Sequence, residues 1–126
     1  RFNPGEYSTI DLLVRGDCDA ALILGADPGA TMPQPCIDHL AHIPTITLDP
    51  KVTHTSRLSR VHITTAATGI SAPGTGYRMD EVPLPLRPAL KSPYPTDEDV
   101  IRRIHEAVAA KPDWLSPNGR LVSAQV

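Results

Sequence analysis

The sequence predicts an α/β fold: a Rossmann-like parallel sheet with flanking helices, followed by a long proline-rich extended segment and a C-terminal helix. Strand-length segments at 19–25, 44–49 and 60–64 alternate with helix-length segments, an order typical of parallel α/β proteins. The 126 residues also include 14 prolines, crowded between Pro73 and Pro95. Because proline cannot continue a helix or donate to a strand ladder, this part of the chain is expected to be extended and irregular.

The first element is a short helix from Ser8 to Arg15. Ser8 and Asp11 have the spacing of an N-terminal capping pair, and Gly16 is a residue type that commonly ends helices.

The segment from Asp19 to Gly25 is the strand around which the other elements are arranged. Its five consecutive apolar residues, Ala20 to Leu24, predict a strand that is buried on both faces. A tight loop at 27–29 follows, and a second helix is expected at 34–41. The inner side of that helix is predicted to carry Ile37, Leu40 and Ala41.

Two more strands complete the predicted sheet. In the segment 44–49, alternation places Ile46 and Leu48 on one face. A helical turn at 55–58 leads to the strand at 60–64, where Val61 and Ile63 lie opposite His62.

The remaining residues predict one loop, one extended segment and one helix. Residues 65–80 are rich in glycine and small side chains and predict a long loop. Prolines on alternate positions make 82–86 an edge strand or a polyproline segment. The last helix is expected at 96–110, with Thr96 as its cap and an apolar stripe at helical spacing. The tail from residue 113, which holds Trp114, is expected to pack on a neighbouring surface.

Composition excludes several classes of function. The chain has 12 basic and 14 acidic residues, a net charge of −2, so no broad field favours nucleic acid or an anionic membrane. No apolar run approaches the roughly 20 residues that span a bilayer, and no signal-peptide core is present, so a cytoplasmic protein is expected. Because the chain starts at Arg1 without a methionine, we expect it to be part of something longer, although a trimmed terminus is an equal alternative.

The sequence does not favour a metal site or a catalytic site formed by this chain alone. His39 and His42 are one helical turn apart but lack a third ligand in register, so a metal site is not expected. No Ser-His-Asp order, nucleophile elbow or phosphate-binding Walker loop is present. Cys18 and Cys36 form no recognisable pair and are expected to be reduced, buried small hydrophobes.

The loop after the first strand is the strongest candidate site. Ligands bind outside the carboxyl ends of strands in open α/β sheets, where small residues admit a phosphate or a pterin. A plain turn between strand and helix is the competing interpretation of the same residues.

Three motifs resemble the C-terminal α/β portion of molybdopterin oxidoreductases, and more specifically the B subunit of formylmethanofuran dehydrogenase. The motifs are Gly25-Ala26-Asp27-Pro28, then Asp49-Pro50 followed by Thr53-x-Thr55, and lastly Gly74-Thr75-Gly76-Tyr77-Arg78-Met79-Asp80. The alternative resemblance is to the counterpart of that subunit in the bacterial formyltransferase/hydrolase complex of tetrahydromethanopterin-dependent one-carbon metabolism. The resemblance runs from Arg1 to about Arg103 and implies a molybdopterin-oxidoreductase-like domain at 1–92, with a C-terminal helix and tail at 93–126 that pack on it or on a partner.

The family implies a tungsten or molybdenum centre held by two pterin guanine dinucleotides, with its metal-binding cysteine or selenocysteine upstream of this region. Carried over by position, the cofactor-binding residues are Gly25, Ala26 and Asp27 in the first loop, Asp49 and Thr53 in the second, and Gly74, Thr75 and Tyr77 in the distal motif. Asp49 is suited to accept hydrogen bonds from guanine or ribose donors.

Two departures from the family pattern put cofactor binding in doubt. The stretch 59–64 differs from the usual Ala-Asp-Val-Val-Leu-Pro, and Ser71 stands where the family has a glutamate. We therefore expect a non-catalytic structural subunit without cofactor in a formyltransferase/hydrolase-type complex, contacting other subunits through 83–95 and the Trp114 tail. The alternative is the C-terminal part of a tungsten or molybdenum formylmethanofuran dehydrogenase with its pterin dinucleotide retained. Arg78 is expected to fix the loop 69–80 by bonding main-chain carbonyls or a nearby carboxylate such as Asp80.

Overall fold

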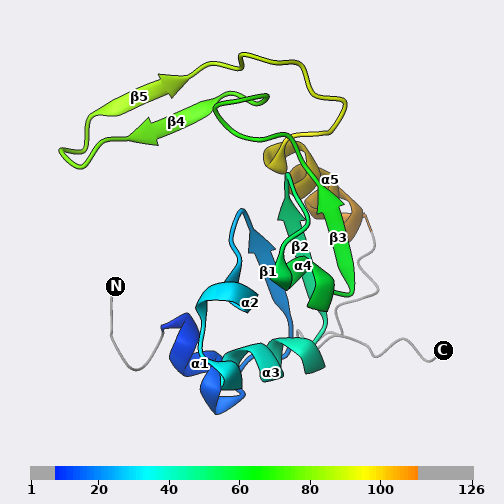
Figure 1. Cartoon of the computed structure of the whole chain (residues 1–126). Coiled ribbons are helices and arrows are strands. Elements are labelled where there is room, and N and C mark those ends of the chain that lie inside the picture. Colours follow the sequence, from blue (N-terminus) through cyan, green and yellow to red (C-terminus); the bar gives the residue numbers. More distant parts are fainter. Residues whose placement is uncertain (1–7, 111–126) are drawn as a thin grey trace. The chain divides into compact units, whose positions relative to one another are not determined.

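The computed structural model describes residues 8–110, and these divide into two compact units between Thr96 and Asp97. Within these described residues the first unit holds four helices and five strands, and the second holds one helix. Figure 1 labels each of them. In chain order the elements are α1 (Thr9–Arg15), β1 (Ala21–Leu24), α2 (Pro28–Thr31), α3 (Gln34–His42), β2 (Thr45–Asp49), α4 (His54–Leu58), β3 (Val61–Thr64), β4 (Gly74–Tyr77), β5 (Pro83–Leu86) and α5 (Asp97–Ala109). The α/β class is confirmed, whereas the assignment of domains at residue 92 stays a prediction.

The main sheet has three parallel strands in the order β1-β2-β3. Its register aligns Leu22 with Ile46 and Val61, and Leu24 with Leu48 and Ile63. Residues aligned in a parallel sheet share a face, so these six apolar side chains form one face of the sheet. The strands β2 and β3 agree with the predicted segments and with the predicted alternation.

The prediction that β1 is buried on both faces is wrong for the described residues. Ala21 and Ile23 pack against the helices, but Leu22 and Leu24 are 49% and 38% exposed. The reason is the strand order, because β1 lies at the edge of the sheet while β2 lies in its centre. Leu48 of β2 is correspondingly fully buried.

The core of the first unit lies where α1 and α3 meet β1. Leu13, Cys36 and Leu40 form its buried centre, with Ala21 and Ile23 packed beside them. The predicted inner face of α3 is thus correct for Leu40 but wrong for Ala41, which is exposed. Cys36 takes the inner position instead, one turn before Leu40. Both cysteines are unpaired as predicted, but only Cys36 is buried as expected, whereas Cys18 is half-buried.

Helix α1 begins and ends as its sequence predicts. The Ser8 hydroxyl accepts a hydrogen bond from the Asp11 amide at 3.3 Å and donates one to the Asp11 carboxylate. Gly16 adopts φ +74°, the left-handed conformation that lets its amide close the last turn.

Two predicted loops contain regular structure. The residues expected to be a tight loop at 27–29 begin α2, because Pro28 occupies the first helical position, where its fixed φ is favourable. Part of the predicted long loop at 65–80 is the strand β4, which pairs antiparallel with β5. Prolines 83 and 85 make β5 an edge strand, one of the two predicted forms.

The second unit contains α5 in its described part. Its bounds fall within the predicted helix, and three acidic residues occupy its first turn, where they complement the helix dipole. Arg102 bonds to Asp99 and Glu106 along the exposed side of the helix. Trp114 lies outside the described residues.

Candidate functional site

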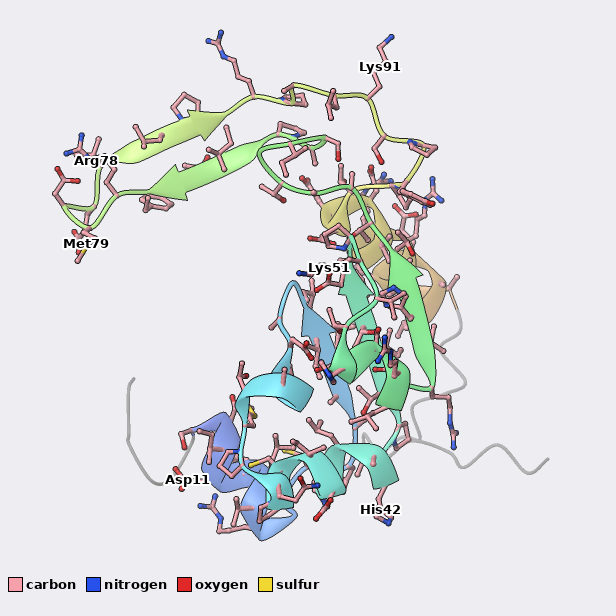
Figure 2. The ribbon with its side chains drawn as sticks, viewed as in Figure 1. Asp11, His42, Lys51, Arg78, Met79 and Lys91 are labelled. Carbon is pink, nitrogen blue, oxygen red and sulfur yellow. The ribbon has the colours of Figure 1, made fainter. Side chains whose placement is uncertain are left out.

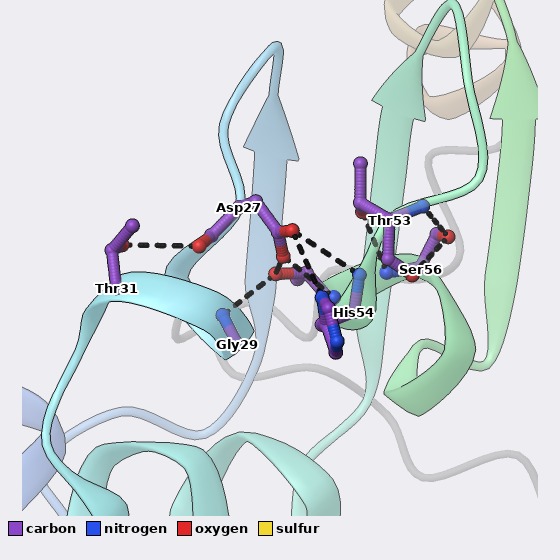
Figure 3. Close-up of polar contacts among 7 residues, drawn as sticks. Asp27, Gly29, Thr31, Thr53, His54 and Ser56 are labelled. Atoms are coloured by element: carbon purple, nitrogen blue, oxygen red, sulfur yellow. Dashed lines mark hydrogen bonds and ion pairs between the residues drawn. The ribbon is translucent and has the colours of Figure 1, made fainter.

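The loops after β1 and β2 meet at the carboxyl edge of the sheet through one carboxylate. Asp27, after β1, accepts hydrogen bonds from the main-chain amide and the hydroxyl of Thr55, at 2.8 and 2.7 Å. It also accepts one from the His54 amide at 3.2 Å (Figure 3). These amides belong to the first turn of α4, so Asp27 acts as an N-terminal cap supplied by another loop.

These contacts change the ionisation of Asp27. Desolvation acts to raise the pKa of Asp27, but the hydrogen bonds from Thr55 and His54 outweigh it and lower the pKa from 3.8 to about 2. The carboxylate is therefore charged at neutral pH, and the His54 ring lies 3.5 Å from it.

Close packing reinforces the same junction. The Gly29 amide donates to the Thr55 hydroxyl at 2.8 Å, so Thr55 links α2 to Asp27. A Cβ at Gly29 would lie 2.9 Å from the Thr55 nitrogen, and this position therefore requires glycine. Thr53, the residue directly before α4, caps the same helix. Its hydroxyl accepts a hydrogen bond from the Ser56 amide, and the Ser56 hydroxyl accepts one from the Thr53 amide.

A polar cavity of about 360 Å³ opens beside this junction. Three basic side chains, Lys51, His54 and Arg57, line it together with Asp27 and Thr53. Figure 2 shows Lys51 beside the carboxyl end of β2. Because Asp27 already occupies the first amides of α4, an anion in this cavity would be bound mainly by the basic side chains.

The predicted site residues fall into four places: the polar cavity, an apolar cavity, the end of β2 and the strand β4. Asp27 and Thr53 line the polar cavity, and Gly25 precedes it with φ +56° and open space around its Cβ position. Ala26 lines a separate apolar cavity, and Asp49 is buried at the end of β2, where it accepts a hydrogen bond from the Lys51 amide at 3.0 Å.

The distal residues Gly74, Thr75 and Tyr77 form β4, and none of them lines the polar cavity. Sequence reasoning did not identify the basic residues of the cavity or the partner of Asp27. The sequence signal for the basic residues was their three-residue spacing, at 51, 54 and 57, directly after a predicted strand end.

Two negative findings apply to residues 8–110. Within that range no group of three or more histidine, cysteine, aspartate or glutamate side chains is arranged to hold a metal ion. No helix in the same range is both long and apolar enough to cross a bilayer.

No protein-family model matches the chain. The chain is 44% identical over 93 residues to the B subunit of tungsten-containing formylmethanofuran dehydrogenase 2 from Methanocaldococcus jannaschii. It is 43% identical, also over 93 residues, to the subunit of the same name from Methanococcus maripaludis. The resemblance to the B subunit of formylmethanofuran dehydrogenase is confirmed.

The alignment to these two relatives covers 74% of this chain but 21% of each relative. The chain therefore spans about one fifth of the length of the curated relatives it matches.

Proposed function

We propose that this chain is part of the B subunit of a formylmethanofuran dehydrogenase-type complex, and that it binds the phosphate-bearing end of a pterin dinucleotide. The polar cavity at the carboxyl edge of the sheet carries this proposal. Lys51 and Arg57 supply positive charge, and the guanidinium of Arg57 can bond two phosphate oxygens at once. The same proposal includes a Rossmann-like arrangement, in which the ligand lies beyond the ends of parallel strands.

The charges of the cavity fit an anionic group. The cavity holds three basic side chains and one acidic side chain, and that acid is already bound to the first turn of α4. Gly25 does not line the cavity, but the space around its Cβ position is open. When bound, a tungsten or molybdenum pterin group supplies two-electron redox chemistry, and this chain's residues would bind and orient its nucleotide end.

A second candidate is a scaffold without cofactor, as in a formyltransferase/hydrolase-type complex. The observation in its favour is Ser71, which replaces the family's glutamate. Its hydroxyl accepts a hydrogen bond from the Ala67 amide at 3.0 Å and so closes a turn. In this chain position 71 has a structural contact, and no carboxylate is available there for a cofactor.

The metal and pterin content of the complete subunit decides between the two functions. The cofactor proposal expects about one equivalent of tungsten or molybdenum per subunit, with pterin in proportion. Replacing both Lys51 and Arg57 by Ala should reduce that content several-fold, because two of the three basic contacts are removed.

A matched control is Lys91→Ala, which removes an exposed lysine that does not line the cavity. Its metal content should equal that of the unsubstituted subunit. A subunit purified without metal or pterin would overturn the cofactor proposal and support the scaffold.

A further inference from the structure

The edge strand β1 has the composition of an interior strand. All of its residues are apolar, yet Leu22 and Leu24 are 49% and 38% exposed. Antiparallel sheets commonly leave one face open to water, but parallel strands are normally covered on both faces. Exposure of this apolar face of β1 to water is therefore unfavourable.

Among residues 8–110, no strand pairs with the second hydrogen-bonding edge of β1. The Ala21 amide donates to the Pro44 carbonyl and the Gly25 amide to the Leu48 carbonyl, both at 2.9 Å. Since main-chain groups of a strand alternate in direction, residues 21, 23 and 25 face β2. The amides and carbonyls of Leu22 and Leu24 consequently point away from β2, toward the free edge of the sheet.

An apolar cavity of about 490 Å³ runs along this free edge. Four consecutive residues, 20–23, line it, and no residue of β2 does, which places the cavity on the outer side of β1. Leu12 and Leu13 of α1 and Met32 after α2 form much of its wall. Its volume lies in the range of sites that bury a drug-sized molecule, so it can accept several apolar side chains.

We infer that the free edge of β1 receives a fourth strand, an extended apolar segment supplied by further polypeptide of the longer subunit. A small apolar ligand would fill the cavity and contact Leu22, but it would leave the main-chain edge and Leu24 uncovered, because Leu24 does not line the cavity. A strand satisfies all three features, because its backbone pairs with β1, one set of side chains enters the cavity and the other covers the leucines. The relatives have about four fifths of their length outside the matched region, which is ample polypeptide for such a strand.

This inference rests on the part of the proposed function that makes the chain a portion of a longer subunit. It does not depend on cofactor binding, which is tested by metal and pterin content.

Amide hydrogen exchange at residue resolution tests the fourth strand. The 126-residue chain alone is compared with the same residues in the complete subunit. Ala21 and Ile23 should be protected in both, since their amides face β2. Leu22 and Leu24 should exchange rapidly in the chain alone and at least ~100-fold more slowly in the complete subunit.

Two results would overturn the inference. Equal exchange of Leu22 and Leu24 in the two samples would mean that no strand pairs there. Protection that appears in the chain alone and grows with its concentration would identify a second copy as the occupant.

A pair of substitutions tests the apolar face separately. Leu22→Lys and Val14→Lys each place a charge at a position that is about half exposed, 49% and 52% respectively. Only Leu22 lies on β1, so Leu22→Lys should reduce the yield of folded complete subunit several-fold relative to Val14→Lys. Equal yields of the two variants would contradict coverage of this face.

Discussion

The Asp27 carboxylate joins two parts of the chain that lie 28 residues apart in sequence. It does so with three hydrogen bonds from a single helical turn, and its side chain is only 27% exposed. Hydrogen bonds to a charged acceptor are stronger than hydrogen bonds between neutral groups. Without the Asp27 carboxylate, its donors on His54 and Thr55 would be left unsatisfied. The alignment of the first two strand-end loops therefore depends strongly on this residue.

Replacing Asp27 by Asn should lower the free energy of unfolding by about 1–3 kcal/mol at pH 7, because the amide group of Asn would face amide donors. In the folded protein the pKa of Asp27 is lowered from 3.8 to about 2. The contribution of Asp27 to the free energy of unfolding is therefore complete above pH 3.8 and is lost as the pH falls toward 2. The difference between the two proteins should therefore shrink across that pH range. Denaturant unfolding of dilute protein at several pH values measures it.

The control for this change is Asp17→Asn. Asp17 pairs with Arg15 at 2.8 Å on the surface, where an ion pair contributes about 0–1 kcal/mol. A loss for Asp27→Asn no larger than for Asp17→Asn would show that the Asp27 bonds do not hold the loops together.

At the scale of elements, the hairpin β4–β5 departs most from the predicted loop. The Arg78 amide bonds to the Val82 carbonyl and the Glu81 amide to the Arg78 carbonyl, which closes a tight turn. Glu81 adopts φ +63°, an unusual conformation for a residue with a side chain. Figure 2 shows Arg78 and Met79 at this tip of the hairpin.

The predicted pairing of Arg78 with Asp80 is confirmed, with a nitrogen–oxygen distance of 3.0 Å. Both side chains are more than half exposed, so the pair is expected to stabilise the turn modestly. Arg78→Lys keeps the charge but loses the planar guanidinium, and should lower the free energy of unfolding by about 0.3–1 kcal/mol. Thermal unfolding and assembly of the complete subunit are the measurements.

Lys91→Arg is the control for Arg78→Lys, since it exchanges the same residue types at another exposed position. If Arg78→Lys changes neither the melting temperature nor assembly, Arg78 has no structural role in the hairpin.

At the scale of the whole molecule, the first unit exposes a large apolar surface for its size. In the part of the chain that the structure describes, its sheet has three strands and two edges, and its hairpin is a separate pair of strands. The exposed large apolar residues of this unit include Leu22, Leu24, Val61, Ile70, Tyr77, Met79, Leu84 and Leu90. Such surfaces commonly mark contacts with other polypeptide.

The chain expressed alone is therefore expected to self-associate. Light scattering at micromolar to millimolar concentration should report particles larger than a monomer, because apolar surface and open strand edges promote association. Added polypeptide that covers β1 should reduce the scattering. A compact, soluble monomer with cooperative unfolding would contradict this expectation.

Short-range patterns in the sequence were sufficient to predict most elements. Ser8, Asp11 and Gly16 predicted both ends of α1 because capping bonds join residues only a few positions apart. Alternation in β2 and β3, and the helical repeat of α5, were equally local. The order of helix and strand then predicted the parallel sheet, since the α/β alternation itself favours parallel pairing.

Tertiary structure alone decided which of these elements are covered and which loops meet. The apolar run 20–24 predicted a buried strand, but burial of β1 depends on its neighbours, and the described residues place it at an edge. Asp27 was recognisable as a loop residue, whereas its bond to Thr55 depends on how two distant loops pack. Lys51, His54 and Arg57 gather at one cavity for the same reason. Local preferences are encoded within a few residues, but the distances between separate loops are set by the packing of the whole unit.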